Sequence, residues 1–274
     1  MPAETPAVLP YFVTNYVACG DARLVFLFLD PETNAVVSAP DRTAEVAFYD
    51  LANDPDTPVA TEVGEFVWAI PDQRGMYIVN VELPTAGEWG AEITTSAPGS
   101  AEVTSRMRFE VHDSSPVVAV GDKAPATDTP TLEDVGGDIA KLSTDDRPES
   151  AFYETSVTDA LAAHEPFVIA FATPKFCTSA QCGPTIDRLK PIARAHPDVT
   201  FINVEPYLLE YSAGGLQPVL DGQGQLQATD VTDTWGLLSE PWVFVVDGDG
   251  IIRGSFEGVL GDEELEAAIV EVSS

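Results

Sequence analysis

At 274 residues the chain is long enough for two domains of ordinary size, and its formal net charge of −32 disfavours binding to phosphate backbones and to anionic lipid surfaces. We therefore expect no nucleic-acid partner, and no run approaches the roughly 18 apolar residues that a membrane-spanning helix needs, so no membrane insertion is expected. The beginning, Met1-Pro-Ala-Glu-Thr, lacks the basic and apolar regions of a signal peptide, and three cysteines are too few for a disulfide framework.

Short apolar or alternating runs separated by turn residues fill the first part of the chain. Runs of this length and spacing, without helical periodicity, predict an antiparallel β-sandwich over residues 10–115. The seven expected strands are Phe12–Ala18, Leu24–Leu29, Ala44–Tyr49, Glu65–Ala69, Met76–Val81, Gly90–Thr95 and Val103–Val111.

Two short motifs lie within these strands, Arg74-Gly-Met-Tyr and Ala86-Gly-Glu-Trp. They resemble the immunoglobulin-like YtkA type of bacterial extracytoplasmic domain, which implies an immunoglobulin-like sandwich. Cys19 precedes Gly20 at an expected strand end, where the pattern predicts a buried, inert thiol. His112 and the nearby methionines are too few and too scattered for a copper site, so we expect no metal here.

Residues 116–150 are rich in Pro, Asp, Thr, Ser and Gly, which predicts a linker or an irregular lead-in segment. Within it, Val120-Gly-Asp-Lys-Ala-Pro125 resembles the Gly-x-x-Ala-Pro sequence that precedes thioredoxin-like and peroxiredoxin domains.

Strands and helices alternate in the remainder of the chain, residues 151–274. This order, with a closing strand pair and a last helix, predicts an α/β domain with a mixed sheet. The expected elements are a helix at Val157–Ala163, strands at Val168–Ala172 and Val199–Val204, a helix up to about His196, strands at Trp242–Val246 and Ile251–Phe256, and a helix at Asp262–Val270.

Two cysteines, Cys177 and Cys182, lie where the buried strand before them gives way to a helix. Pro184 suits the first turn of that helix, because its missing N–H has no partner there. A helix N-terminus stabilises a thiolate, the reactive form of cysteine. Four of the eight basic residues after position 116 flank the motif and predict a local cationic patch: Lys175, Arg188, Lys190 and Arg194. We interpret the junction as a redox site.

The cysteine spacing also predicts the local geometry. Side chains five positions apart on one helix diverge by about 140°, so a disulfide needs Cys177 to lie outside the regular helix or the helix to unwind locally. Pro184 favours the first alternative, because it makes the helix start late. Cys177 is then the more exposed, attacking thiol, with its pKa lowered from about 8.5 by Lys175 and by the helix N-terminus, and Cys182 is the resolving thiol. The opposite assignment holds if Cys182 occupies the helix start and takes the larger share of the dipole.

Three further stretches match a known pattern: the strand before the cysteines, Phe201-Ile-Asn-Val-Glu, and Glu240-Pro241-Trp242 with a later Gly258. Together they resemble the thioredoxin-like family. The resemblance implies a thioredoxin-like fold for residues 151–274 and no cofactor. It also implies that Pro241, which lies between Glu240 and Trp242 in the sequence, is cis and faces the disulfide. With the preceding sandwich, it also implies an extracytoplasmic thiol–disulfide oxidoreductase of the bacterial cell envelope that acts on protein thiols and disulfides.

The chain departs from that family in its cysteine spacing, because thioredoxins have two residues between the cysteines and this chain has four. Atypical two-cysteine peroxiredoxins have a similar Cys-Thr-x-x-x-Cys segment, which implies a peroxidase as a second candidate function. Those enzymes, however, place a Thr three residues before the first cysteine, and Thr173 is four before it. They also keep an Arg where this chain has Glu240-Pro241-Trp242.

The cysteine pair is also compatible with copper binding and with a purely structural disulfide. A copper chaperone of the Sco type would need His164 or His196 as a ligand, although both positions fit ordinary structural roles better. A non-catalytic envelope binding module would keep the disulfide for structure alone. If one residue is inserted before Cys177, Ala170 occupies the position of the buried acid that assists thioredoxin chemistry. Glu205 is the available substitute, although its loop position predicts an exposed carboxylate.

Overall fold

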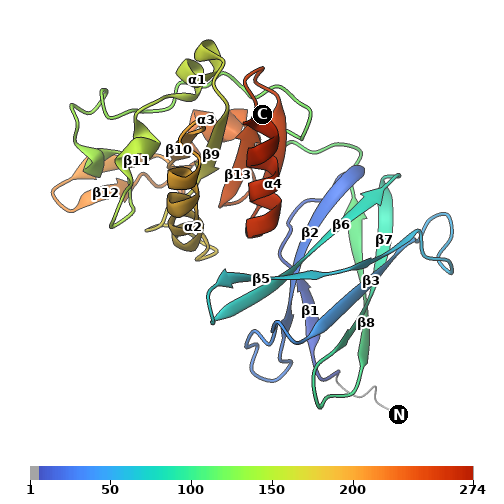
Figure 1. Cartoon of the computed structure of the whole chain (residues 1–274). Helices are drawn as coiled ribbons and strands as arrows, with labels where there is room; N and C mark the ends of the chain where they lie inside the picture. The colour runs from blue at the N-terminus through green and yellow to red at the C-terminus, as the bar shows by residue number, and fades with distance from the viewer. Residues whose placement is uncertain (1–5, 274) are drawn as a thin grey trace. The chain divides into compact units, whose positions relative to one another are not determined.

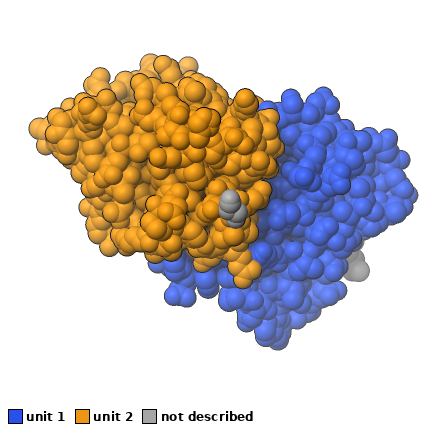
Figure 2. Space-filling view, turned by 45° about the horizontal axis from the view of Figure 1, so that its top comes forward, with its two compact units in different colours: residues 1–115 blue, residues 116–274 orange. Residues whose placement is uncertain are grey.

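The computed structural model describes residues 6–273. The chain divides into two compact units, Met1–Ser115 and Pro116–Ser274, which Figure 2 distinguishes by colour. Cys19 belongs to the first unit, and Cys177 and Cys182 belong to the second. No helix in the described range is both long and apolar enough to cross a membrane.

The first unit is built from two four-stranded antiparallel sheets (Figure 1). One sheet has the order β1-β2-β6-β5, and the other has the order β4-β3-β7-β8. The strands are β1 (Leu9–Phe12), β2 (Gly20–Leu29), β3 (Thr43–Asp50), β4 (Ala60–Val63), β5 (Glu65–Ile70), β6 (Arg74–Leu83), β7 (Gly87–Ser96) and β8 (Val103–Val111).

Side chains from both sheets form one apolar core in this unit. Phe26 and Tyr77 come from the first sheet, Phe48 and Trp89 from the second, and each is almost fully buried. Strand β3 alternates buried and more exposed positions, as expected for a strand with one face on a core. The predicted β-sandwich is confirmed.

The start of the sandwich differs from the prediction. Residues 12–18 do not form the expected strand, because β1 ends at Phe12. The N–H of Val25 donates to the hydroxyl of Thr14 at 2.8 Å, so a side chain replaces the main-chain acceptor that a continued ladder would use. Strand β4 was not predicted, because its four residues alternate without a single buried position.

The second unit contains a four-stranded sheet of order β10-β9-β13-β14 and a separate hairpin of β11 and β12. Strands β9 and β10 pair in parallel, whereas β13 pairs antiparallel with both of its neighbours. The elements are α1 (Val157–Ala163), β9 (Phe167–Phe171), α2 (Cys182–Ala195), β10 (Thr200–Val204), β11 (Leu209–Ser212), β12 (Gly215–Pro218), α3 (Asp230–Thr234), β13 (Trp242–Val246), β14 (Ile252–Glu257) and α4 (Asp262–Val272), with short 3-10 turns at Ile139–Lys141 and Ser150–Tyr153.

Strand β9 is the centre of this unit, and all five of its residues are buried. Because side chains alternate along a strand, Val168 and Ala170 face one core, which includes apolar residues of α2 and α4. Ile169 and Phe171 face a second core with residues of α1 and with Trp235. The cysteine-bearing loop therefore begins at the end of a strand that is fixed on both faces.

The segment 116–150 belongs to the second unit and packs against the rest of it. The N–H of Val118 donates to the carbonyl of Trp235 at 3.3 Å, and the indole N–H of Trp235 donates to the Thr127 hydroxyl at 3.1 Å. A side chain at Gly236, where φ is +71°, would put its Cβ 1.9 Å from the carbonyl oxygen of Pro116. Only a glycine allows this close approach.

The predicted thioredoxin-like α/β class is wrong for this chain. The described residues form fourteen strands, and only α2 and α4 exceed seven helical residues, so the protein is mainly β. In the second unit a single long helix, α2, connects parallel strands. After β10 the chain forms the β11–β12 hairpin and the five-residue α3, instead of a second long crossover helix, and it enters β13 antiparallel.

Candidate functional site

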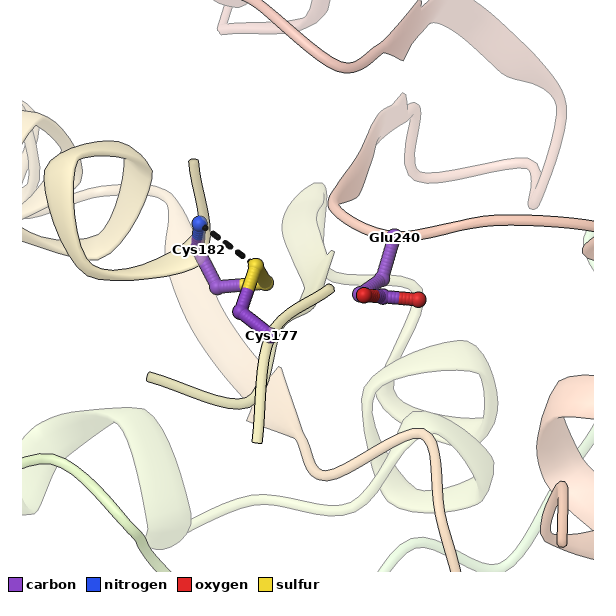
Figure 3. Close-up of side chains that lie close together, drawn as sticks. All are labelled: Cys177, Cys182 and Glu240. Atoms are coloured by element: carbon purple, nitrogen blue, oxygen red, sulfur yellow. Dashed lines mark hydrogen bonds between the residues drawn. A yellow bond between two sulfur atoms is a disulfide. The ribbon is translucent and has the colours of Figure 1, made fainter. Parts of the chain in front are cut away.

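Cys177 and Cys182 form a disulfide with a Cα–Cα distance of 6.0 Å. Cys177 lies in the loop that follows β9, and Cys182 is the first residue of α2 (Figure 3). The predicted geometry is confirmed, because the first cysteine is outside the helix and Pro184 is in the first helical turn. Ala180, between the two cysteines, has a φ of +61°, an uncommon conformation for a residue with a side chain.

The start of α2 is directed at the first cysteine. The backbone N–H of Cys182 donates to Sγ of Cys177 over 3.2 Å, and the side chain of Gln181, the preceding residue, makes no capping hydrogen bond. N–H groups of the first helical turn have no partner within the helix, so the sulfur of Cys177 takes the role of a cap. Such a donor stabilises negative charge on Cys177 whenever the disulfide is open.

The two sulfur-bearing residues differ in accessibility. Cys182 is 0% exposed and belongs to the apolar core that β9, α2 and α4 share. Cys177 is only partly buried and packs at the margin of that core. An attacking reagent therefore reaches Cys177 first.

Glu240, directly before β13, holds the loop between the cysteines in place. Its Oε1 accepts hydrogen bonds from the backbone N–H and the hydroxyl of Thr178, both at 2.7 Å. Its carbonyl oxygen accepts from the Ser179 hydroxyl at 3.0 Å. The hydroxyl of Tyr207 donates to Oε2, and burial and then this carboxylate raise the pKa of Tyr207.

The sequence did not predict this role for Glu240. It was singled out only as the residue before Pro241, and its partner Thr178 is 62 positions away. The peptide bond between Glu240 and Pro241 is cis, as the resemblance implied. Trp242 begins β13, where its indole N–H donates to Ser239 at 3.1 Å and its ring stacks on Phe244.

The expected cationic patch is largely neutralised in the structure. Lys190 forms ion pairs with Asp145 at 2.7 Å and with Asp187 at 2.8 Å. Arg188 pairs with Asp262, and Arg194 pairs with Glu149. Three of the four expected charges are therefore paired with acids that come from both near and distant parts of the chain.

Lys175 is exposed, and its ammonium lies 5.6 Å from the centroid of the Phe176 ring. The two histidines lie in other contacts. His164 ends α1 and approaches the carbonyl of Gly248 at 3.1 Å, whereas His196 ends α2 and contacts Glu266 at 2.8 Å. The ring of His196 is thus held by a carboxylate on α4.

Glu205 follows β10 and is mostly buried, so the expectation of an exposed loop carboxylate is wrong. Its Oε1 accepts from the backbone N–H of Thr144 at 2.6 Å, and the Thr173 hydroxyl is a further hydrogen-bond partner. Burial raises the pKa of Glu205 to about 6, against the lowering effect of these hydrogen bonds. Thr173, the residue four positions before Cys177, therefore makes hydrogen bonds with Glu205 and Thr144.

The burial of Glu205 predicts a specific pH dependence of stability. Its folded-state pKa of about 6 exceeds the ordinary 4.5, so the folded protein binds this proton more tightly than the unfolded chain does. The resulting contribution to the free energy of unfolding is complete below pH 4.5 and is lost as the pH rises through 6. The difference corresponds to about 2 kcal/mol. Denaturant unfolding at about pH 4 and pH 7 should show that wild type loses about 2 kcal/mol more than Glu205→Gln over this range.

The matched control is Glu210→Gln, since Glu210 is an exposed residue of β11. This variant should follow the pH profile of the wild type. Parallel profiles for wild type and Glu205→Gln would show that Glu205 is ionised in the folded protein as easily as in water.

One group of candidate metal ligands occurs among the described residues. The two sulfurs of Cys177 and Cys182 and a carboxylate oxygen of Glu240 all lie within 4.8 Å of one another (Figure 3). The third cysteine, Cys19, is free and partly buried in the first unit, where its N–H donates to the carbonyl of His112 at 2.9 Å. The prediction of a buried Cys19 is thus met only in part.

No protein-family model matches the sequence, and no curated protein matches it. Among solved structures, the chain is similar to a DUF4426 family protein from Pseudomonas aeruginosa PAO1 at 9% identity and a TM-score of 0.25, over 35% of this chain and 68% of that one. It is also similar to MtrC from Shewanella baltica OS185 at 10% identity and a TM-score of 0.26, over 89% of this chain and 51% of that one.

A third similar structure is a protein proposed to be a glycoside hydrolase from Bacteroides vulgatus ATCC 8482, at 12% identity and a TM-score of 0.25. The match covers 83% of this chain and 41% of that one. At these TM-scores, none of the similarities bears on what this chain does.

Proposed function

We propose that the chain is a thiol–disulfide oxidoreductase whose redox pair is Cys177 and Cys182. The observation that carries the proposal is the asymmetry of the disulfide. Its partly exposed sulfur, on Cys177, receives the first free N–H of α2, while the sulfur of Cys182 is enclosed in the core. One sulfur is open to exchange, and the other is shielded from it.

Each position suits one step of the exchange. In the reduced protein, the thiolate of Cys177 attacks a substrate disulfide, forms a mixed disulfide and releases one substrate thiolate. The thiolate of Cys182 then attacks Sγ of Cys177, which reforms the intramolecular disulfide and releases the second substrate thiolate. The two thiol protons of the protein pass to solvent and to the departing thiolates, so the protein loses two electrons and the substrate gains them.

The surroundings of Cys177 favour the first step in two ways. The N–H of Cys182 and the partial positive charge of the 14-residue helix α2 stabilise a thiolate at Cys177. Glu240 fixes Thr178 and Ser179, so the loop between the cysteines keeps both sulfurs within bonding distance. Cys177 is therefore the attacking thiol in this proposal, and Cys182 is the resolving thiol.

The proposal includes a location and a class of partner. Disulfides persist in oxidising compartments, and a periplasmic or cell-surface location agrees with the bond between Cys177 and Cys182. The partners are protein thiols and disulfides that reach the partly exposed sulfur of Cys177. The β-sandwich of the first unit supplies no part of the redox pair.

The proposal is tested by catalytic turnover of a peptide that contains one disulfide, with a small dithiol recycling the protein. Thiol release should exceed the rate without protein, and it should fall to that rate in Cys177→Ser. Cys19→Ser is the matched control and should retain the full rate. A wild-type rate equal to the rate without protein would contradict the proposal.

A further inference from the structure

Three possible metal-donor atoms lie close together in the second unit: the two sulfurs of the disulfide and one carboxylate oxygen. They are Sγ of Cys177 in the loop after β9, Sγ of Cys182 at the start of α2, and a carboxylate oxygen of Glu240 before β13, all within 4.8 Å of one another (Figure 3). In the oxidised protein the two sulfurs are bonded to each other, so neither can bind a metal as a thiolate. Reduction changes this cluster into two thiols next to a carboxylate.

The donor set selects a class of metal ion. Zn²⁺ binds both thiolate sulfur and carboxylate oxygen with tetrahedral geometry. Where the protein supplies three ligands, a water takes the fourth position. Cu(I) prefers sulfur alone, and Mg²⁺ and Ca²⁺ prefer oxygen alone. Two sulfurs and one oxygen therefore fit Zn²⁺ better than these competitors.

Glu240 is already held as a metal-binding carboxylate is usually held. It is only 4% exposed, and Thr178 and Tyr207 donate hydrogen bonds to its two oxygens. Such outer hydrogen bonds orient a ligand before the metal arrives. Oε1 already accepts two hydrogen bonds from Thr178, but Oε2 accepts only the one from Tyr207. Since a carboxylate oxygen has two lone pairs, Oε2 can bind a metal without releasing these partners.

Access and charge also favour a cation at this place. Cys177 is partly exposed, which leaves a path to the cluster from solvent. The chain has a net charge of −32, and a field of this sign raises the local concentration of cations.

We propose that the reduced protein binds one Zn²⁺ through Cys177, Cys182 and Glu240. A reductant first gives two electrons to the disulfide and is itself oxidised. A dithiol also supplies the two thiol protons, whereas with a phosphine they come from the water whose oxygen the phosphine takes up. Zn²⁺ then displaces the two thiol protons, which pass to solvent. The disulfide and the metal exclude each other, so oxidation of the pair by a substrate disulfide, which takes up the two electrons, releases Zn²⁺, and bound Zn²⁺ holds the pair reduced.

The test uses the full chain with Cys19→Ser, so that the redox pair supplies all of its thiols. The protein is reduced with a phosphine, freed of reductant under nitrogen and titrated with Co²⁺, which reports on a Zn²⁺ site by its colour. Thiolate-to-cobalt charge-transfer absorption, with the visible bands of tetrahedral Co²⁺, should saturate at one equivalent and disappear when Zn²⁺ is added. The oxidised protein should show none of these bands.

Variants assign the ligands. Cys177→Ser and Cys182→Ser should each lose much of the charge-transfer absorption, and Glu240→Gln should keep it but bind Co²⁺ roughly tenfold or more weakly. Glu210→Gln is the control, an exposed carboxylate of β11 outside the cluster, and should bind like the parent protein. Binding that is unchanged in Glu240→Gln, or absent in the reduced parent, would overturn the proposal.

A second measurement needs no variant of the cluster. X-ray absorption of the Zn²⁺-loaded protein should show two sulfurs and two lighter ligands, whereas four sulfurs would mean that two chains share the metal and would overturn the assignment. Because a phosphine opens the disulfide whether or not the protein exchanges disulfides, the metal site and the oxidoreductase activity can fail independently.

Discussion

Iodoacetamide is expected to modify Cys177 at neutral pH at least roughly tenfold faster than Cys182 in the reduced protein. The reason is the asymmetry between the sulfurs: Cys182 is 0% exposed, whereas Cys177 is partly exposed and receives the N–H of Cys182 at 3.2 Å. The measurement compares Cys182→Ser, in which Cys177 reacts, with Cys177→Ser, in which Cys182 reacts.

Both variants carry Cys19→Ser, because Cys19 is a partly buried thiol that would react as well. Cys182→Ser should also accumulate a mixed disulfide with a peptide disulfide, since the resolving thiol is gone. Faster alkylation of Cys182 than of Cys177 would reverse the two roles and would show that occupying the helix start matters more than exposure.

Replacing Glu240 with alanine should lower the free energy of unfolding of the second unit by about 2–4 kcal/mol. Two residues lose their acceptor at once, Thr178 for its N–H and hydroxyl and Tyr207 for its hydroxyl. The side chain is also 4% exposed, so its removal leaves a cavity. Denaturant unfolding measured in the oxidised protein gives the difference.

Glu240→Gln is the graded comparison, with an expected loss of about 1 kcal/mol, because the amide oxygen still accepts from Thr178. Glu210→Ala is the surface control, and its effect should stay within about 0.5 kcal/mol. If Glu240→Ala were as stable as this control, water would replace the carboxylate at no cost, and Glu240 would not anchor the loop.

Local patterns were sufficient to predict most elements of the second unit. The continuous apolar run before the cysteines became the fully buried β9, and helix α1 and strand β13 begin and end where their periodicity predicts. The position of Cys177 outside the helix also followed from helix geometry together with Pro184. In these cases the signal lies within about ten neighbouring residues.

Long-range contacts account for what the sequence missed. Glu240 anchors a loop 62 positions away, and Glu205 is buried against Thr144, 61 positions away. Contacts between residues so far apart leave no periodic pattern in the sequence. The prediction of a cationic patch failed for the same reason. Lys190 and Arg194 pair with Asp145 and Glu149, which are distant from them in the sequence.

The fold class was wrong because it rested on the alternation of a few strands and helices, while the long segment between β10 and β13 was assigned no element. Apart from isolated bridges, the segment between β10 and β13 holds the five-residue α3 and the β11–β12 hairpin, in which Leu216 alone is buried. A hairpin with a single buried residue carries little apolar periodicity, so no strand was predicted where these two form. The resemblance to thioredoxin-like proteins then extended an α/β pattern to a chain that is mainly β.

The central claim, that Cys177 and Cys182 are a working redox pair, is tested most directly by their reduction potential. The protein is equilibrated with glutathione buffers of graded composition, and the reduced fraction is measured by alkylation and mass. We predict a potential between about −270 and −120 mV, the range of disulfides that exchange with protein thiols. A value below about −300 mV would contradict the account, because such a bond resists the glutathione pool and is structural.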